Sequence, residues 1–218
     1  MPRSRRQPAA SRVRPEPTPY DGDGLEPEGD YDTLAFTDLD LSGERASGAR
    51  FLDCTMVRCT LSDTDLRKTS LRDLLVRDAR AVGVDLAETS WLDVAVENTL
   101  LAGAQVHASE LRRVTFRGGK IDYVNFRAAR LTDVCFADCV LREPDFGGAT
   151  LTRVSFPGSR LVGAELTKVT LRDVDLRGCD IDIARGYESL GGAIIDSAEL
   201  AALAPALAAQ LGIDVRDP

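Results

Sequence analysis

The side chains best suited to covalent or acid–base chemistry in this 218-residue chain are one histidine and five cysteines. His107 has no second histidine and no evident partner with which to build a catalytic triad. Cys135 is the best candidate for a reactive thiol, because the other cysteines occupy a position, defined below, where a thiol packs as a small apolar side chain. Those others are Cys54, Cys59, Cys139 and Cys179.

The sequence contains no Cys-x-x-Cys pair, no phosphate-cradling glycine loop and no cluster of metal ligands. An odd number of cysteines without paired spacing does not form a disulfide framework and fits a reducing compartment. We therefore expect no catalytic, cofactor-binding or metal-binding residues, and no enzymatic activity.

Charge recognition is the remaining candidate chemistry. One series of charged residues at intervals of twenty consists of aspartates with two arginines in its second half: Asp53, Asp73, Asp93, Arg113, Asp133, Arg153 and Asp173. Such a series forms one face only if the fold stacks residues that are twenty apart. The five aspartates are then the candidate partner-binding acidic face, and the alternative is that they form a merely solvated ladder.

A fivefold repeat supplies the elements that position these residues. Every fifth residue from Phe36 to Ile181 is apolar, which makes thirty consecutive centres, and these include all seven phenylalanines of the chain. Two residues before each centre, 25 of the 30 positions hold Ala, Cys, Ser, Thr, Val or Gly. Residues two apart on an extended segment share a side, so both positions point inward and the next two form a corner. Each pentapeptide is therefore one short side of a coil.

The pairing of large and small centres indicates four sides per coil. Trp91, the only tryptophan, lies ten residues from Ala81, which is one of just two alanine centres. In a four-sided coil these two residues occupy opposite walls, and a bulky ring that faces a methyl group keeps the volume of the core nearly constant. Residues twenty apart would then stack about 4.8 Å apart, at the spacing of paired strands.

The repeat resembles that of the pentapeptide-repeat family, whose motif is commonly written A(D/N)LXX. Good local matches are Val84-Asp85-Leu86, Val124-Asn125-Phe126, Ala164-Glu165-Leu166 and Val174-Asp175-Leu176. The resemblance implies an all-β, right-handed quadrilateral β-helix over residues 34–183. Thirty repeats on four sides give about 7.5 coils (30/4).

The resemblance also implies a class of function. The register is unbroken from Phe36 to Ile181, so the chain is similar to the loop-free, actinobacterial type of the family. Members that act on bacterial type II topoisomerases resemble duplex DNA in shape and charge, and they inhibit the enzyme or protect it from quinolones. We expect a non-enzymatic interaction protein that presents its faces to a protein partner; the alternative is a DNA mimic that modulates DNA gyrase.

The two ends depart from the repeat. Residues 1–33 are rich in proline and charge and are expected to form a disordered tail. In residues 184–218, Asp196 and Glu199 match a capping box. The apolar face that follows would cap the last coil or pair two copies of the chain as a homodimer: Leu200, Leu203, Leu207 and Leu211.

Composition limits the partners. The net charge of −8 and the pI near 4.8 argue against direct binding of nucleic acid, since lysine and arginine supply most of the affinity for phosphates. There is no apolar run of about eighteen residues and no secretory signal, so we expect a cytoplasmic location and no membrane contact.

Overall fold

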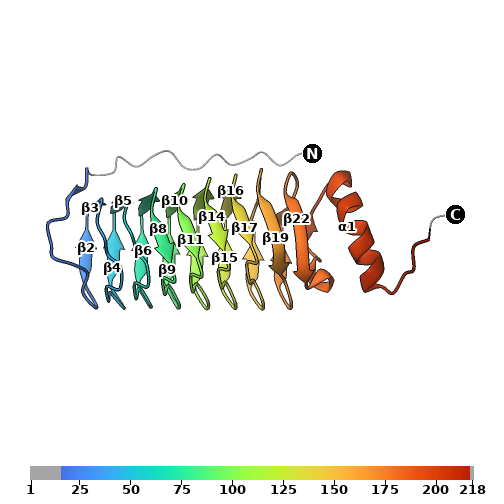
Figure 1. Ribbon diagram of the computed structural model, residues 1–218, viewed down its shortest axis with the longest axis horizontal. Coiled ribbons are helices and arrows are strands. Elements are labelled where there is room, and N and C mark those ends of the chain that lie inside the picture. Colours follow the sequence, from blue (N-terminus) through green and yellow to red (C-terminus); the bar gives the residue numbers. More distant parts are fainter. Residues whose placement is uncertain (1–15, 217–218) are drawn as a thin grey trace.

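The computed structural model describes residues 16–216, and over that range the chain winds into a parallel β-solenoid of about nine turns (Figure 1). Strands on successive turns pair in register at a separation of twenty residues, as Phe116 does with Phe136. Each turn has four walls, which we number in the order in which the chain visits them. Walls 1 to 3 are β-sheets, and wall 4 is a column of single β-bridges.

The strands are short, and most have three residues. Wall 1 contains β2 (Asp30–Asp32), β4 (Arg50–Leu52), β6 (Ser70–Arg72), β9 (Ser90–Leu92), β12 (Glu110–Arg112), β15 (Arg130–Thr132), β18 (Thr150–Thr152) and β20 (Thr170–Arg172). Wall 2 contains β1 (Thr18–Pro19), β3 (Leu34–Thr37), β5 (Thr55–Val57), β7 (Leu75–Arg77), β10 (Ala95–Glu97), β13 (Thr115–Arg117) and β16 (Cys135–Ala137). A separate pair, β21 (Val174–Asp175) and β23 (Ala193–Ile194), follows these strands.

Walls 3 and 4 complete each turn. Wall 3 contains β8 (Arg80–Val82), β11 (Leu100–Ala102), β14 (Lys120–Asp122), β17 (Val140–Arg142), β19 (Arg160–Glu165) and β22 (Asp180–Arg185). The bridges of wall 4 join Arg45, Asp65, Asp85, Gln105, Asn125, Asp145 and Glu165 in succession. The chain ends in a 3-10 turn (Tyr187–Ser189) and helix α1 (Ser197–Gln210).

The interior confirms the inward positions that the repeat predicts. Phe136 is fully buried and lies in a column of parallel rings, with centroids 4.8 Å from Phe116 and 5.0 Å from Phe156. The small inward position is buried as well, including Cys54, Cys59, Cys139 and Cys179. Stacking of equivalent apolar residues on successive turns therefore builds one continuous apolar core.

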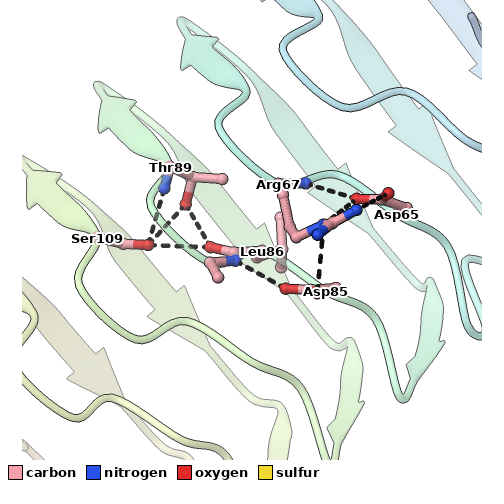
Figure 2. Close-up of polar contacts among 7 residues, drawn as sticks. Asp65, Arg67, Asp85, Leu86, Thr89 and Ser109 are labelled. Carbon is pink, nitrogen blue, oxygen red and sulfur yellow. Dashed lines mark hydrogen bonds and ion pairs between the residues drawn. The ribbon is translucent and has the colours of Figure 1, made fainter. Parts of the chain in front are cut away.

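Trp91 and Ala81 line the same interior space, as expected if the large indole offsets the small methyl group. The two side chains do not fill that space completely, because an apolar cavity of about 40 Å³ remains there. The indole nitrogen of Trp91 donates a hydrogen bond to the buried Thr89 hydroxyl at 2.7 Å. Thr89 in turn contacts Ser109 and the carbonyl of Leu86, at 3.0 and 2.8 Å (Figure 2). These hydroxyls satisfy the indole N–H inside an otherwise apolar core.

Each corner of the coil contains one residue with a left-handed backbone conformation. Every fifth residue from Glu28 to Gly178 has a positive φ, between 45° and 74°, and only nine of these 31 residues are glycine. Asp and Asn tolerate this conformation better than most side chains, and ten of the corner residues are Asp or Asn. The acidic corners therefore have a conformational cause as well as any functional one.

The solenoid begins before residue 34, where the sequence analysis placed its start. Strand β2 pairs with β4, and the buried Tyr31 ring stacks on Phe51 with centroids 4.7 Å apart. Tyr20 stacks on Phe36 at 4.4 Å. Residues 16–33 thus form the first turn and cover the rings of the next. The rest of the expected tail, residues 1–15, lies outside the described residues.

The number of turns consequently exceeds the predicted 7.5. The early turn adds to the N-terminal end, and β22 and β23 continue the coil beyond Ile181. The repeat slips there, because the pairing of β19 with β22 contains register shifts and Ile183 becomes the buried residue.

Helix α1 covers the last turn (Figure 1). The predicted capping box is present, since Asp196 accepts hydrogen bonds from the N–H groups of Ala198 and Glu199. The Glu199 carboxylate accepts from the Asp196 N–H at 2.8 Å and from the Gly178 N–H at 2.9 Å. The Glu199 side chain thus caps the N-terminus of helix α1 and links the helix to the final corner of the solenoid.

Candidate partner-binding surfaces

The predicted acidic series lies along the corner between walls 1 and 2. All seven of its residues share the left-handed corner conformation and stack on successive turns, which brings Asp53, Asp73 and Asp93 into one line. The three side chains are half-buried, whereas Asp133 and Asp173 are exposed. The stacking confirms the spatial series; its role in binding stays a prediction.

Arginines neutralise part of this series, beginning with its third aspartate. Arg113 donates Nε and Nη2 to the two carboxylate oxygens of Asp93, both at 2.6 Å. Arg153 pairs with Asp133 in the same way, at 2.6 and 2.8 Å, and its hydrogen bonds lower the pKa of the Asp133 carboxyl below its ordinary value. Fork-to-fork pairing of this kind is the strongest form of exposed ion pair. The unbroken acidic stretch is therefore confined to the first turns.

Wall 4 carries a second acidic column with its own neutralising residues. The Asp65 carboxylate accepts from the Arg67 guanidinium at 2.7 and 2.9 Å, and the same guanidinium lies 3.6 Å from Asp85 (Figure 2). Asp65 also accepts from the Arg67 backbone N–H at 3.1 Å, and Asp85 accepts from the Ala87 N–H in the same manner. The acids of this wall therefore stabilise its turns.

The structure separates the four predicted C-terminal leucines into two pairs. Leu203 is buried and Leu207 is half-buried against the core. Leu200 and Leu211 are 51% and 76% exposed. The first pair contacts the solenoid, and the second pair remains available at the surface of helix α1 and its end.

The isolated nucleophilic and titratable residues are dispersed. His107 lies half-buried on wall 4, and its Nδ1 atom is buried without a hydrogen-bond partner among the described residues. Cys135 is half-buried on wall 2. Within residues 16–216, no group of three or more His, Cys, Asp or Glu side chains could hold a metal ion. In the same range, no helix combines the length and apolar character that crossing a membrane requires.

One surface was missed by the sequence analysis. The outward positions of wall 1 gather arginine and hydroxyl side chains, although the chain as a whole is acidic. The signal was present in the sequence as two further series at intervals of twenty, one with Arg50 and Arg130 and one with Arg72, Arg112 and Arg172.

A four-walled solenoid with a five-residue repeat defines a class of elongated repeat protein. A profile described as the pentapeptide repeat region matches residues 49–126 and 89–166, which together span more than half of the chain. The chain belongs to the pentapeptide-repeat family. No curated protein matches it in sequence.

Two of the solved structures to which this chain is similar are QnrB1 and HetL. Full-length QnrB1, a plasmid-mediated fluoroquinolone resistance protein, is 14% identical; the match covers 79% of this chain and 99% of QnrB1, with a TM-score of 0.52. HetL, from the cyanobacterium Nostoc sp. strain PCC 7120, is 18% identical over 78% of this chain and 90% of HetL, with a TM-score of 0.24. At this identity, the QnrB1 match supports the fold alone.

Proposed function

We propose that this chain is a non-enzymatic interaction protein that presents the walls of its solenoid to a protein partner. The observation that carries the proposal is the fixed register of the outward side chains, which parallel pairing repeats at twenty-residue intervals along each wall. Such ladders form long, rigid and chemically regular surfaces, which suit recognition of another macromolecule.

Capture and mapping test this proposal. The immobilised chain should retain a protein from a lysate of its source organism, and the purified partner should then bind saturably. Hydrogen exchange should show protection on one wall of the solenoid in the complex. Failure to obtain any partner that binds saturably would count against the proposal.

The second candidate is a DNA-mimic modulator of DNA gyrase, which the line of Asp53, Asp73 and Asp93 favours, although Arg113 pairs with the last of these. QnrB1, which shares the fold, is named as a fluoroquinolone resistance protein. The overall charge favours it less: residues 36–181 carry 22 acids and 20 bases, a net charge of −2. About 36 Å of duplex DNA carries roughly 21 negative charges. We therefore expect weak inhibition of gyrase at most.

The acidic line allows a sharp test of this candidate. The triple change of Asp53, Asp73 and Asp93 to Asn should abolish inhibition of supercoiling, and added salt should weaken the inhibition by the wild-type chain. Asn tolerates the left-handed corner as Asp does, so the fold should survive. The matched control changes Asp38, Asp78 and Asp138, on the next corner, to Asn. Inhibition that both triples retain would remove the acidic line from the mechanism.

A further inference from the structure

Wall 1 is basic at its outward positions, and it holds more arginine there than wall 3, whose outward residues from Arg80 to Val162 also carry a net positive charge. From β4 to β20 its strands offer fourteen outward positions, which hold five Arg, one Glu, six Ser or Thr and two Leu. The net charge of these fourteen positions is therefore +4 (5 − 1), and it is +2 (5 − 3) when Asp30 and Asp32 of β2 are included, on a chain whose net charge is −8. The excess is carried by arginine alone, with hydroxyl groups between the guanidinium groups.

Most guanidinium groups of wall 1 form no close ion pair, although the charge of Arg112 helps to lower the pKa of Asp133. Arg50 pairs with Asp30 through two hydrogen bonds of 2.9 and 2.8 Å. The other four arginines of this wall, Arg72, Arg112, Arg130 and Arg172, form no ion pair with any carboxylate of residues 16–216. The arginines at the neighbouring corner and on wall 4 do form such pairs. The Arg50–Asp30 pair shows how this wall engages a carboxylate.

A groove and a rigid base lie between two of these arginines. Leu92 pairs in register with Arg72 on one side and with Arg112 on the other. The surface there is hollowed by about 170 Å³, lined by Ser70, Arg72, Ser90, Leu92, Glu110 and Arg112. Beneath it, the Trp91–Thr89–Ser109 hydrogen bonds hold the wall in place. The arginines therefore project from a backbone that does not need to reorganise on binding.

The spacing along wall 1 suits an extended polypeptide. Arg72 and Arg172 are five turns apart, or about 24 Å at the spacing of paired strands. An extended segment of about seven residues spans that length, and its alternate side chains, about 7 Å apart, point to one side. Such a segment presents four side chains to one side, which equals the number of arginines; Arg130 lies in the outward column before the buried centres, and the other three lie in the column after them.

We propose that wall 1 is a docking surface for an extended, acidic segment of a partner protein, whose alternate carboxylates pair with Arg72, Arg112, Arg130 and Arg172. Arginine recognises carboxylates through two parallel hydrogen bonds, and the Ser and Thr hydroxyls supply further donors and acceptors. This inference rests on the proposed function, because it names the chemistry of the partner.

The surroundings of wall 1 favour a peptide over a nucleic acid. Duplex DNA carries one phosphate charge for every 1.7 Å of its axis. It would also bring phosphates against the aspartate series at the corner beside the wall, including Asp53 and Asp173. A single extended peptide is narrower and can follow the arginines along the wall, although Asp73 and Asp173 directly follow Arg72 and Arg172 in the chain.

The test uses a fluorescein-labelled, eight-residue peptide of alternating Glu and Ser, long enough to span the four arginines. Anisotropy titration at low ionic strength should show saturable binding that weakens by about tenfold or more at physiological salt. The triple variant R72Q/R112Q/R130Q should bind at least about tenfold more weakly than wild type. Circular dichroism and melting temperature establish that each variant is folded.

The matched control is R80Q/R117Q/R142Q, which removes the same charge from walls 2 and 3. It should keep the peptide affinity within about twofold of the wild-type value. Absence of saturable binding at about 1 mM peptide would overturn the inference. An equal loss of peptide affinity in the two triple variants would also overturn the inference. Tighter binding of an oligothymidylate of the same charge would overturn it too, and would identify a nucleic-acid surface instead.

Failure of this inference is distinguishable from failure of the proposed function. A lysate partner that binds R72Q/R112Q/R130Q as tightly as wild type would overturn the role of wall 1 and leave the proposed function intact. The gyrase assay reports on the aspartate series at the corner and does not involve the four arginines.

Discussion

The corner residues show how one backbone conformation shapes the surface chemistry of this protein. Their positive φ recurs every fifth residue, and L-residues other than Gly, Asn and Asp adopt it at a cost. Selection for a tolerable corner thus enriches aspartate there irrespective of binding. The aspartate series could be found from the sequence, but its conformational cause could not, because periodicity reports which side chains point inward and says nothing of φ.

The cost of the corner can be measured at adjacent alanines. Ala128 has a φ of 56° and an exposed side chain, whereas Ala129 is fully buried. Ala128→Gly should raise the free energy of unfolding by up to about 1 kcal/mol, because relief of the left-handed strain outweighs the entropy that glycine adds to the unfolded chain. Ala129→Gly, which only removes a packed methyl group, should lower it by about 1 kcal/mol. Urea denaturation compares the two, and equal losses would contradict the assignment.

The cysteines give a second test at the residue scale. Burial raises the pKa of Cys54, Cys59 and Cys139, and that of Cys179 to about 12, so these thiols should resist attack in the folded protein. A disulfide reagent at pH 8 should modify Cys135 alone, and five thiols in denaturant. Cys135→Ser should abolish the native reaction. Rapid modification of a second thiol in the folded state would mean that the core opens locally.

At the scale of elements, the columns of stacked rings carry the stability of each turn. Phe136 lies between two parallel rings and has no exposed surface, so Phe136→Ala should cost about 3 to 5 kcal/mol. Arg127 points outward and forms one exposed pair with Asp145 at 3.0 Å. Arg127→Ala should change stability by about 0.5 kcal/mol or less. Similar costs at the two sites, measured by thermal and denaturant unfolding, would reverse the inward assignment.

The buried and the exposed leucines of helix α1 and its end allow a capping role and an assembly role to be tested separately. Leu203 is buried against the last turn, so Leu203→Ala should lower stability by about 2 to 3 kcal/mol, while the exposed Leu200→Ala should be nearly neutral. Light scattering of the full chain then reports on assembly. A dimer that dissociates on the joint change of Leu200 and Leu211 to Asp would assign that pair to an interface, and a monomer at all concentrations would leave only the cap.

The ends of the solenoid mark the limit of what sequence could predict. The thirty interior centres were readable because one period governs them. Tyr31 continues that period by one step before Phe36, but the prolines and acids around it indicated disorder. Its burial depends on stacking against Phe51, a contact that local composition does not reveal. At the other end, the register shifts between β19 and β22 replace the expected centre with Ile183.

For the whole molecule, the charges form alternating stripes instead of a uniform acidic surface. Hydrogen bonds from arginine lower the pKa of Asp30, Asp38, Asp65 and Asp133. A carboxyl whose pKa is depressed by folding stabilises the protein above its unfolded value and loses that contribution as pH falls through the folded value. The midpoint of thermal unfolding should therefore be level from pH 7 to about pH 5 and fall below about pH 4.

Salt and one variant provide the controls for this pH dependence. High salt should reduce the difference between neutral and acidic melting temperatures, because the pairs are exposed and screened. Arg153→Gln should reduce it slightly by removing the partner of Asp133. A melting temperature that rises on acidification would show that repulsion among the other acids outweighs the pairs.

The sequence has two repeat lengths, and insertions or deletions affect them differently. The core needs an apolar residue every five positions, whereas each wall is revisited only after twenty. Loss of twenty residues would shorten the coil by one turn and leave every later residue on its wall. Loss of five between Arg112 and Arg130 would preserve the core but carry Arg130 and Arg172 onto wall 4, away from Arg72. A five-residue deletion can therefore leave the fold intact and still separate the arginines of wall 1. Related proteins that depend on wall 1 should thus differ in length by multiples of twenty residues.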